Sequence, residues 1–393
     1  MKPAKPRVLV VPEGGIKLCF RLLPILRDAG CAIDVLCLRG EVIAASRYVD
    51  AVIEEGSDDA LLDRLTTLVR RKEHPWRAVI VTHESLARRL ISRADSDFLK
   101  WWQPGALDQT ARPFLLSKLG LEAAGKNSDL PIPPSRVCMK REEILAFGSD
   151  TGWPVVIKPP LGNSGEGITI VGSSDALKSL QRGFQFPVLA QRFIRGREGV
   201  VEAVCSQGLA LACLVSETIK RRKGRLGPAT ARLFAAMPEL HPLVEGVARY
   251  TRFEGFCGFD WIQDEQSGRY YLIEFNPRPT PGFRFGRFCG VDFGRAVVAW
   301  LNGTAKEFAL SCQPQENPVA AYYFPHELAR CLRERDWQAF KQWLPGSRAI
   351  HDICWDDPLP MGVWVTQRLK SLVSLRAWTV HDRPKVSSRA SSS

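Results

Sequence analysis

Short apolar runs alternate with helix-like segments over residues 7–82, and this alternation restricts the fold more than any other feature. The runs at residues 7–11, 32–38 and 78–82 are typical of buried strands, and helical patterns separate them. Strands that alternate with helices form a parallel sheet. The sequence therefore predicts an α/β (α+β) chain with a Rossmann-like N-terminal layer, although residues 11–17 lack the GxGxxG spacing of dinucleotide-binding loops.

The composition predicts a soluble globular protein of the cytoplasm. A chain of 393 residues can hold more than one packed unit, and no uncharged apolar run is long enough for a membrane span. The N-terminus carries no pattern of a secretory signal. Eleven cysteines without a CxxC pair indicate reduced, buried thiols, and six histidines without ligand spacing argue against a histidine-based metal site.

The net charge of +12 is concentrated in two clusters, at residues 220–225 and 278–287. A nucleic acid, a membrane surface or a phosphorylated small molecule could each account for such a charge. The sequence contains no RNP, helix-turn-helix or finger motif, so binding to nucleic acid would depend on charge alone. We expect neither a nucleic acid nor a membrane partner.

Residues 154–171 place a lysine, Lys158, at the end of a β-branched strand and directly before a glycine loop. In one interpretation its stem packs on the strand and its ammonium group reaches water. In the other, the ammonium group contacts phosphate oxygens while backbone N–H groups of residues 162–167 close over them, since glycines allow a close approach and positive φ. The spacing is not that of a Walker P-loop.

Residues 258–279 predict a hairpin whose strands flank the turn DEQSG. If Gln263 pairs with Arg269, Asp260 and Glu274 are diagonal neighbours on one face, roughly 7–8 Å apart at their backbones. Asn276 shares that face because side chains alternate along a strand. Oxygen ligands of this kind suit Mg²⁺, whereas the alternative is a solvated polar face of an edge hairpin.

The order of these hairpins resembles that of the ATP-grasp superfamily, which includes D-alanine–D-alanine ligase, biotin carboxylase and carbamoyl phosphate synthetase. The resemblance covers residues 114–292, and its most specific parts are "LIEFNPRP" and then "VVIKPPLGNSGEG". It implies a pre-ATP-grasp domain, a two-subdomain ATP-grasp fold and a small C-terminal extension. The corresponding boundaries are 1–108, 109–195 (small subdomain with the glycine flap), 196–310 (large subdomain with the metal site), 311–382 and a disordered tail at 383–393.

The resemblance also implies roles for individual residues. It places the nucleotide on Lys118, Lys158, Gly162, Ser164, Gly165, Gly167, Gln191, Phe193, Ile194 and Glu198. Gln191 stands where many members have glutamate, but its amide can still accept a bond from the adenine amino group. The implied metal ligands are Asp260, Glu274 and Asn276, and Arg278 and Lys158 are the implied catalytic groups. Substrate contacts are assigned by location to Lys220, Arg232 and Arg284, with residues 220–232 as a mobile loop.

The activity implied by the resemblance is an ADP-forming carbon–nitrogen ligase that activates a carboxylate as an acyl phosphate and couples it to an amine. Its cofactors would be ATP and Mg²⁺, with two metal ions and Mn²⁺ as a substitute, and its partners a small carboxylate and a small amine. The arginines suggest an acidic or multiply carboxylated substrate. A carboxyphosphate- or carbamoyl-phosphate-forming enzyme, a nucleotide-binding protein without chemistry, and a homodimer all stay open.

Overall fold

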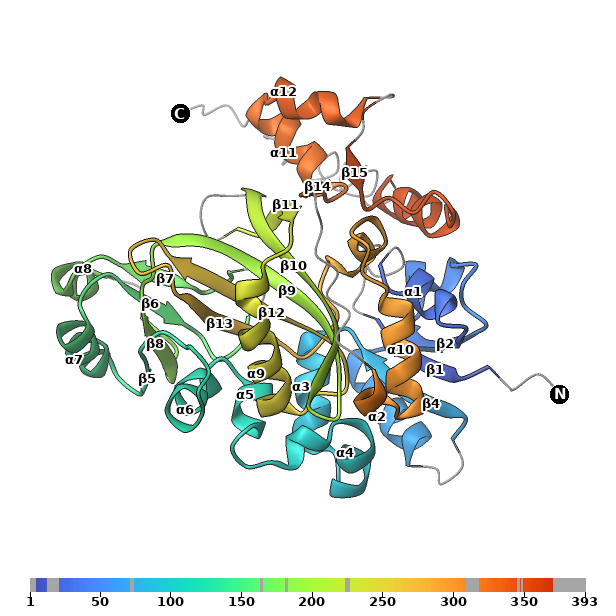
Figure 1. Cartoon of the computed structure of the whole chain (residues 1–393), viewed down its shortest axis with the longest axis horizontal. Helices are drawn as coiled ribbons and strands as arrows, with labels where there is room; N and C mark the ends of the chain where they lie inside the picture. The colour runs from blue at the N-terminus through green and yellow to red at the C-terminus, as the bar shows by residue number, and fades with distance from the viewer. Residues whose placement is uncertain are drawn as a thin grey trace, which may run out of the picture.

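The computed structural model describes residues 5–12, 21–70, 74–162, 165–180, 183–222, 227–308, 318–344, 347 and 349–369. Within these residues the strands form three sheets, and Figure 1 shows the N-terminal sheet at one end and the small sheet of β5–β8 at the other. The largest sheet lies between them (Figure 1). No helix in these ranges is long and apolar enough to cross a membrane.

The N-terminal sheet is four-stranded and parallel in the order β3-β2-β1-β4, as the alternating pattern predicts. Its strands carry β-branched and leucine side chains that are buried among the neighbouring helices. The strands and helices are β1 Arg7–Val11, α1 Leu23–Asp28, β2 Ala32–Leu38, β3 Ala51–Glu55, α2 Asp58–Val69, β4 Trp76–Val81, α3 Glu84–Arg93 and α4 Ser96–Trp102. Pro24 lies in the first turn of α1, where a missing N–H costs no helical bond.

The small sheet is antiparallel in the order β5-β8-β6-β7. Its elements are α5 Arg112–Leu116, α6 Gly120–Asn127, β5 Ser135–Cys138, α7 Arg141–Thr151, β6 Val155–Lys158, β7 Thr169–Val171, α8 Ser174–Ser179 and β8 Val188–Arg192. Residues 111–125 do not form one continuous helix. The helix is interrupted at residues 117–119, where the Lys118 amide donates to the Pro160 carbonyl oxygen at 3.0 Å.

The large sheet has the order β13-β12-β9-β10-β11-β14-β15. Its strands and helices are β9 Gly196–Ser206, β10 Leu209–Arg221, β11 Ala229–Phe234, α9 His241–Thr251, β12 Gly255–Asp264, β13 Tyr270–Asn276, α10 Phe293–Asn302, β14 Val319–Tyr322 and β15 Ile350–His351. Helix α9 packs with Val201 and Ala203 in one core, and α10 packs with Val204 in another. Since neighbouring strand residues point to opposite faces, the two helices cover opposite faces of the sheet.

The C-terminal segment adds strands β14 and β15 to the large sheet and places two short helices above it, α11 His326–Glu334 and α12 Trp337–Phe340 (Figure 1). The two helices are separated by a turn at Arg335, whose φ of 54° lies in the left-handed region. The expectation of reduced thiols holds for eight buried cysteines but not for Cys213, which is disulfide-bonded.

Candidate active site

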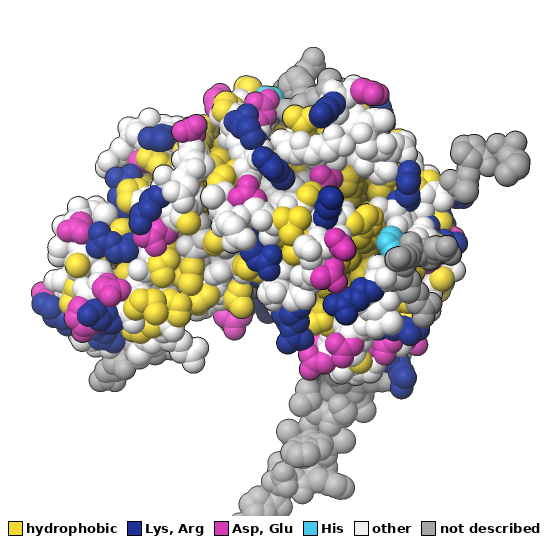
Figure 2. Space-filling model, turned by 90° about the horizontal axis from the view of Figure 1, so that it is seen from below, with side chains coloured by type: hydrophobic (Ala, Val, Ile, Leu, Met, Phe, Trp, Pro, Cys, Tyr) yellow, Lys and Arg dark blue, Asp and Glu magenta, His cyan; other side chains and the backbone are white. Residues whose placement is uncertain are grey.

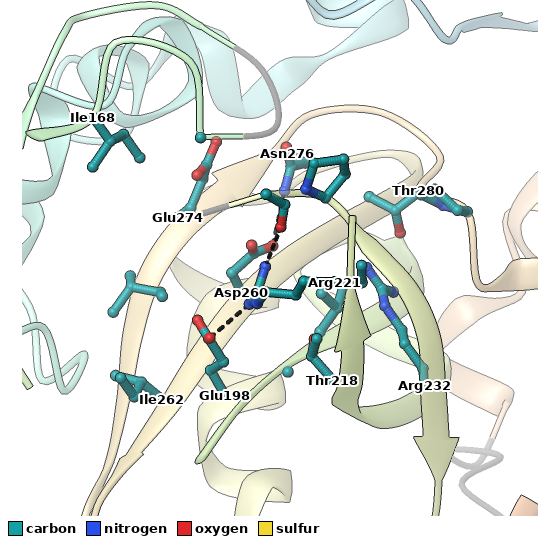
Figure 3. A pocket seen from close by; sticks show the side chains of 18 of the residues that line it. Ile168, Glu198, Thr218, Arg221, Arg232, Asp260, Ile262, Glu274, Asn276 and Thr280 are labelled. Carbon is teal, nitrogen blue, oxygen red and sulfur yellow. Dashed lines mark hydrogen bonds and ion pairs between the residues drawn. The ribbon is translucent and has the colours of Figure 1, made fainter. Parts of the chain in front are cut away.

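A cavity of about 340 Å³ lies between the small sheet and the large sheet. Its walls come from β6 and β8 on one side and from β9, β10, β12 and β13 on the other. Figure 3 shows that Asp260, Glu274 and Asn276 gather at one part of this cavity, with Glu198 and Arg221 beside them. The structure therefore brings the predicted metal ligands and much of the predicted nucleotide site together.

The two carboxylates are closer in register than the sequence suggested. Asp260 pairs directly with Glu274 across β12 and β13, because the register shifts between Asp260 and Trp261. The expected pairing of Gln263 with Arg269 and the diagonal placement of the acids were therefore wrong, and Gln263 pairs with Tyr270. Directly opposed residues in a sheet have adjacent side chains. Burial raises the pKa of Asp260 to about 7, and the charge of Glu274 adds to the increase.

Asn276 completes this acidic group, and its amide nitrogen donates to Asp260 Oδ1 at 3.3 Å. The three side chains offer oxygen atoms only from carboxylates and an amide, which is the ligand type of Mg²⁺. The described residues contain no group of three or more His, Cys, Asp and Glu side chains arranged for a metal ion. A metal ion held by Asp260 and Glu274 would therefore take the Asn276 amide oxygen as its third ligand.

Two buried lysines face the acidic group. The Lys118 ammonium lies 3.1 Å from Glu274 Oε1 and donates to the Gly162 carbonyl oxygen at 2.6 Å. The Lys158 ammonium donates to the Ile273 carbonyl oxygen at 2.9 Å. Burial lowers the pKa of Lys158 to about 8, although Glu274 opposes the decrease. Lys158 is thus not exposed to water at its tip, and the interpretation in which its ammonium reaches solvent was wrong.

Most predicted nucleotide contacts line the cavity. Gln191, Phe193, Ile194, Glu198 and Gly165 all do so. The Gln191 amide nitrogen is held by the Ser135 hydroxyl at 2.8 Å.

The glycine loop has the backbone that the sequence predicted. Gly162, Gly165 and Gly167 adopt φ values of 141°, 80° and 73°, which favour glycine. A Cβ on Gly167 would lie 2.9 Å from the Pro159 ring, so the loop also has no room there for a side chain. Ser164 lies outside the described residues.

Arg278 lines the cavity and is held by an acid that the sequence reasoning missed. Its guanidinium lies 3.3 Å from Glu84 Oε2, at the start of α3 in the N-terminal part of the chain. Glu84 is buried and also accepts from Arg88 Nη2 at 2.8 Å. No motif around Glu84 marks it, since the pairing joins residues that are 194 positions apart.

The predicted substrate residues divide into one that lines the cavity and two that do not. Arg232 lines it, but from strand β11, so the expectation of a mobile loop through residue 232 was wrong. Lys220 is exposed at the end of β10 and does not belong to the lining. Arg284 lines a second cavity and donates to the Ile353 carbonyl oxygen at 3.2 Å.

Three further residues line the cavity that the sequence did not predict as site residues. Arg221 ends β10 and pairs with Glu198 Oε1 at 2.7 Å, and it could have been singled out within the basic run. Arg21 and Tyr323 also line the cavity, although they come from opposite ends of the chain. Neither has a local sequence signal, because the fold alone brings them together.

Comparisons with known proteins agree with this geometry. A family model described as the ATP-grasp domain matches residues 117–282. Acetyl-CoA carboxylase 2 of Oryza sativa subsp. japonica is 27% identical over 148 residues, which are 35% of this chain and 6% of that protein. The chain therefore spans only a small part of that curated relative.

Solved structures with a similar fold cover more of the chain. N5-carboxyaminoimidazole synthetase from Staphylococcus aureus, complexed with ADP, has a TM-score of 0.60 at 11% identity, covering 86% of this chain and 88% of that one. L-amino acid ligase from Bacillus licheniformis has a TM-score of 0.55 at 16% identity, covering 82% and 80%. The family model therefore identifies residues 117–282 as an ATP-grasp domain.

Proposed function

We propose that this protein is an ATP-dependent ligase that activates a carboxylate as an acyl phosphate, with release of ADP, and couples it to an amine. The observation that carries the proposal is the meeting of Lys158, Asp260 and Glu274 at one cavity, with the Lys118 ammonium 3.1 Å from Glu274 Oε1. Cations and acids that face one another suit a triphosphate with a bound divalent ion between them. The similarity to an L-amino acid ligase and to a structure complexed with ADP supports the same activity.

The acidic group fits a magnesium ion. Two directly opposed carboxylates repel each other, and the raised pKa of Asp260 records burial together with this repulsion. A divalent cation held by Asp260, Glu274 and Asn276 would remove the repulsion, and it would neutralise charge on phosphate oxygens.

The chain's own residues account for the other requirements of phosphoryl transfer. Lys118 and Lys158 are buried and positioned to neutralise phosphate charge without a rearrangement of solvent. Arg278, held by Glu84, would stabilise the transferring phosphoryl group and the oxyanion formed when the amine attacks. Glu198 would bind the ribose hydroxyls. The glycine backbone of residues 165–167 would approach the phosphates and exclude water from a reactive acyl phosphate.

The decisive assay follows release of ADP and phosphate by the full chain with pooled amino acids and other small carboxylates, tested in pairs with amines. We expect product release that needs both a carboxylate and an amine. Release of AMP and pyrophosphate would contradict the acyl-phosphate mechanism. MgADP binding, measured by calorimetry, tests the nucleotide site independently of the unidentified substrates.

The similarity to a carboxylase favours a second candidate, an enzyme that forms carboxyphosphate from bicarbonate. ATP hydrolysis that depends on bicarbonate, without an added amine or other carboxylate, would support this second candidate against the first.

One face of the molecule bears on the alternative of a nucleic-acid binder. On the face shown in Figure 2, Lys and Arg side chains are interspersed with Asp and Glu and do not gather into one patch. Proteins that bind nucleic acid through charge present a basic patch or stripe.

A further inference from the structure

Three cavity-lining residues outside the nucleotide and metal assignments lie together, with two arginines beside the ring of a tyrosine. Arg21 precedes α1, Arg232 belongs to β11, and Tyr323 follows β14. The guanidinium carbons of Arg21 and Arg232 lie 5.1 and 5.6 Å from the centroid of the Tyr323 ring. All three residues are buried, at 3%, 8% and 2% exposure. Two buried cations beside one ring need anions nearby.

Carboxylates of the protein neutralise part of this positive charge. Arg21 forms an ion pair with the buried Asp352, and Arg232 Nη1 lies 2.9 Å from Glu202 Oε1. Glu202 Oε1 also accepts from the Thr280 hydroxyl and the Gly282 amide, both at 3.1 Å. Each guanidinium is therefore fixed on one edge by a carboxylate that is itself held. An arginine has five N–H donors, so both residues keep donors for another partner.

Each of the three side chains has one buried donor without a partner in the described part of the chain. Among the described residues, Nε of Arg21, Nε of Arg232 and the Tyr323 hydroxyl have no hydrogen-bond partner. Burial raises the pKa of Tyr323, so its hydroxyl stays protonated and can donate. Native proteins pair almost all buried polar atoms. Three unpaired donors at one cavity indicate a ligand that brings acceptors.

The chemistry of the three groups identifies that ligand. Guanidinium groups match the planar geometry of a carboxylate, and a phenol adds a third donor. We propose that Arg21, Arg232 and Tyr323 form a subsite for a substrate carboxylate that is not activated and is retained in the product. The substrate class is then small carboxylic acids, amino acids included, that carry this group in addition to the reacting one. The assignment of a retained carboxylate rests on the proposed ligase function.

The C-terminal segment builds this subsite. Strand β14 pairs with β11, with Ala321 opposite Arg232, and the Tyr323 amide donates to the Thr230 carbonyl oxygen at 2.9 Å. Asp352, which holds Arg21, follows β15 and accepts from the Phe324 amide at 2.6 Å. The segment thus supplies both the hydroxyl donor and the acid that orients the first arginine.

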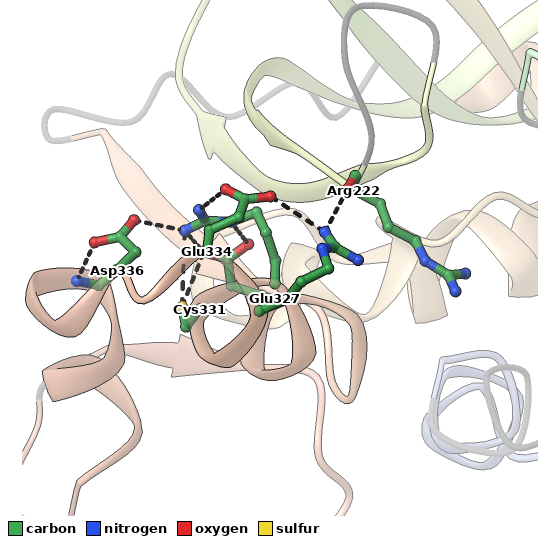
Figure 4. Close-up of polar contacts among 8 residues, drawn as sticks. Arg222, Glu327, Cys331, Glu334 and Asp336 are labelled. Atoms are coloured by element: carbon green, nitrogen blue, oxygen red, sulfur yellow. Dashed lines mark hydrogen bonds and ion pairs between the residues drawn. The ribbon is translucent and has the colours of Figure 1, made fainter.

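Helix α11 ties the same segment to the end of β10. Arg330 is buried and pairs with Glu327, Glu334 and Asp336 at 2.7 to 2.9 Å (Figure 4). Arg333 donates to the Arg222 carbonyl oxygen at 2.6 Å, just beyond the strand end that carries Arg221 (Figure 4). These contacts link α11 to the segment that follows β10.

The test measures binding of succinamate, which has one carboxylate, and of its neutral analogue succinamide, by calorimetry with MgADP present. We expect the wild-type protein to bind succinamate and to bind succinamide at least tenfold more weakly. Tyr323→Phe and Arg232→Lys should each weaken succinamate binding about tenfold while MgADP binding stays unchanged. Arg232→Lys keeps a cation beside Glu202, so the variant should fold. Arg287→Gln, which removes an exposed arginine outside this cavity, serves as the matched control and should not change succinamate binding.

The outcomes separate the subsite from the ligase proposal. Equal binding of succinamate and succinamide, no binding of either, or succinamate binding unaffected by both variants would overturn the subsite. A wild-type protein that does not bind MgADP but binds succinamate in a Tyr323-dependent way would keep the subsite and contradict the ligase proposal.

Discussion

The carboxylate of Glu274 lies between an acid and a base. Asp260 is directly opposite it on β12, and the Lys118 ammonium lies 3.1 Å from its Oε1. Its side chain is 17% exposed, so solvent screens these interactions only in part. Glu274 is thus the residue at which the acidic group and the lysines meet.

We predict that Glu274→Gln lowers the rate of ADP release by about a hundredfold or more, because charge stabilisation at a dry site supplies a large share of catalysis. The fold should survive, since the amide is isosteric and can accept from Lys118. Initial rates and thermal unfolding of the purified variant would check both statements. Glu265→Gln, on the turn of the same hairpin, should keep full activity, and a Glu274→Gln enzyme with wild-type rates would refute the assignment.

Glu84 acts through Arg278 and is a positioning residue. We predict that Glu84→Gln lowers kcat about tenfold and leaves KM for ATP unchanged, because the guanidinium loses its charged partner at 3.3 Å while the nucleotide contacts stay in place. Steady-state kinetics give kcat and KM for ATP separately. Asp59→Asn removes another acid that pairs with α3 and should change neither constant. If Glu84→Gln and Asp59→Asn lowered kcat equally, the effect of Glu84 would be only structural.

At the scale of elements, β9 packs between β12 and β10 and passes close to a bulky side chain. A Cβ on Gly199 would lie 1.8 Å from the Ser216 carbonyl oxygen and 2.6 Å from the Trp261 ring. Trp261 is itself fully buried, so neither neighbour can move freely. Glycine at position 199 therefore lets β9 lie next to the Ser216 carbonyl oxygen and the Trp261 ring without a clash.

We therefore predict that Gly199→Ala lowers the free energy of unfolding by about 1–3 kcal/mol or more, because overpacking forces the backbone to shift. Urea titration followed by circular dichroism gives the value. Gly172→Ala is the matched control, since no atom lies within 4 Å of the added Cβ and the backbone is not left-handed. If both variants had the same stability, the packing argument would fail.

The elements also show the limits of sequence patterns. The period of apolar residues predicted many of the strands, since burial of alternate side chains leaves a clear signal, but not β11, which overlaps the expected loop at residues 220–232. It did not predict the break between α5 and α6, because Lys118 leaves the helix to bond Pro160, which is remote in sequence. It also missed the register shift beside Asp260, since a bulge has no marker in this hairpin.

At the scale of the whole molecule, the N-terminal and C-terminal parts are joined directly. Asp357 is completely buried and accepts from the Ser46 hydroxyl and from the Arg47 amide, the latter at 3.2 Å. Arg21 and Asp352 form a second link between the same parts. These contacts span more than 300 positions of sequence.

We predict that Ser46→Ala and Asp357→Asn are coupled in a double-mutant cycle by about 1–3 kcal/mol, since the pair is buried and charge-assisted. The free energy of unfolding should be measured for the wild type, both single variants and the double variant. Asp357→Asn paired with Ser92→Ala, on the remote α3, should show additive effects. Additivity in the first cycle would show that the two parts are not energetically linked at this point.

The sequence by itself determined the α/β class, many of the strands and the residue types of the proposed nucleotide and metal sites. These follow from local patterns, because strand period and glycine content act over a few residues and the hairpins carry the acids and Lys158 within short segments. Only the tertiary structure decided that Glu84 holds Arg278, that Lys118 meets Glu274, and that Arg21, Arg232 and Tyr323 share one cavity. Each of these joins side chains from distant segments, and their proximity depends on how the sheets and the C-terminal segment pack.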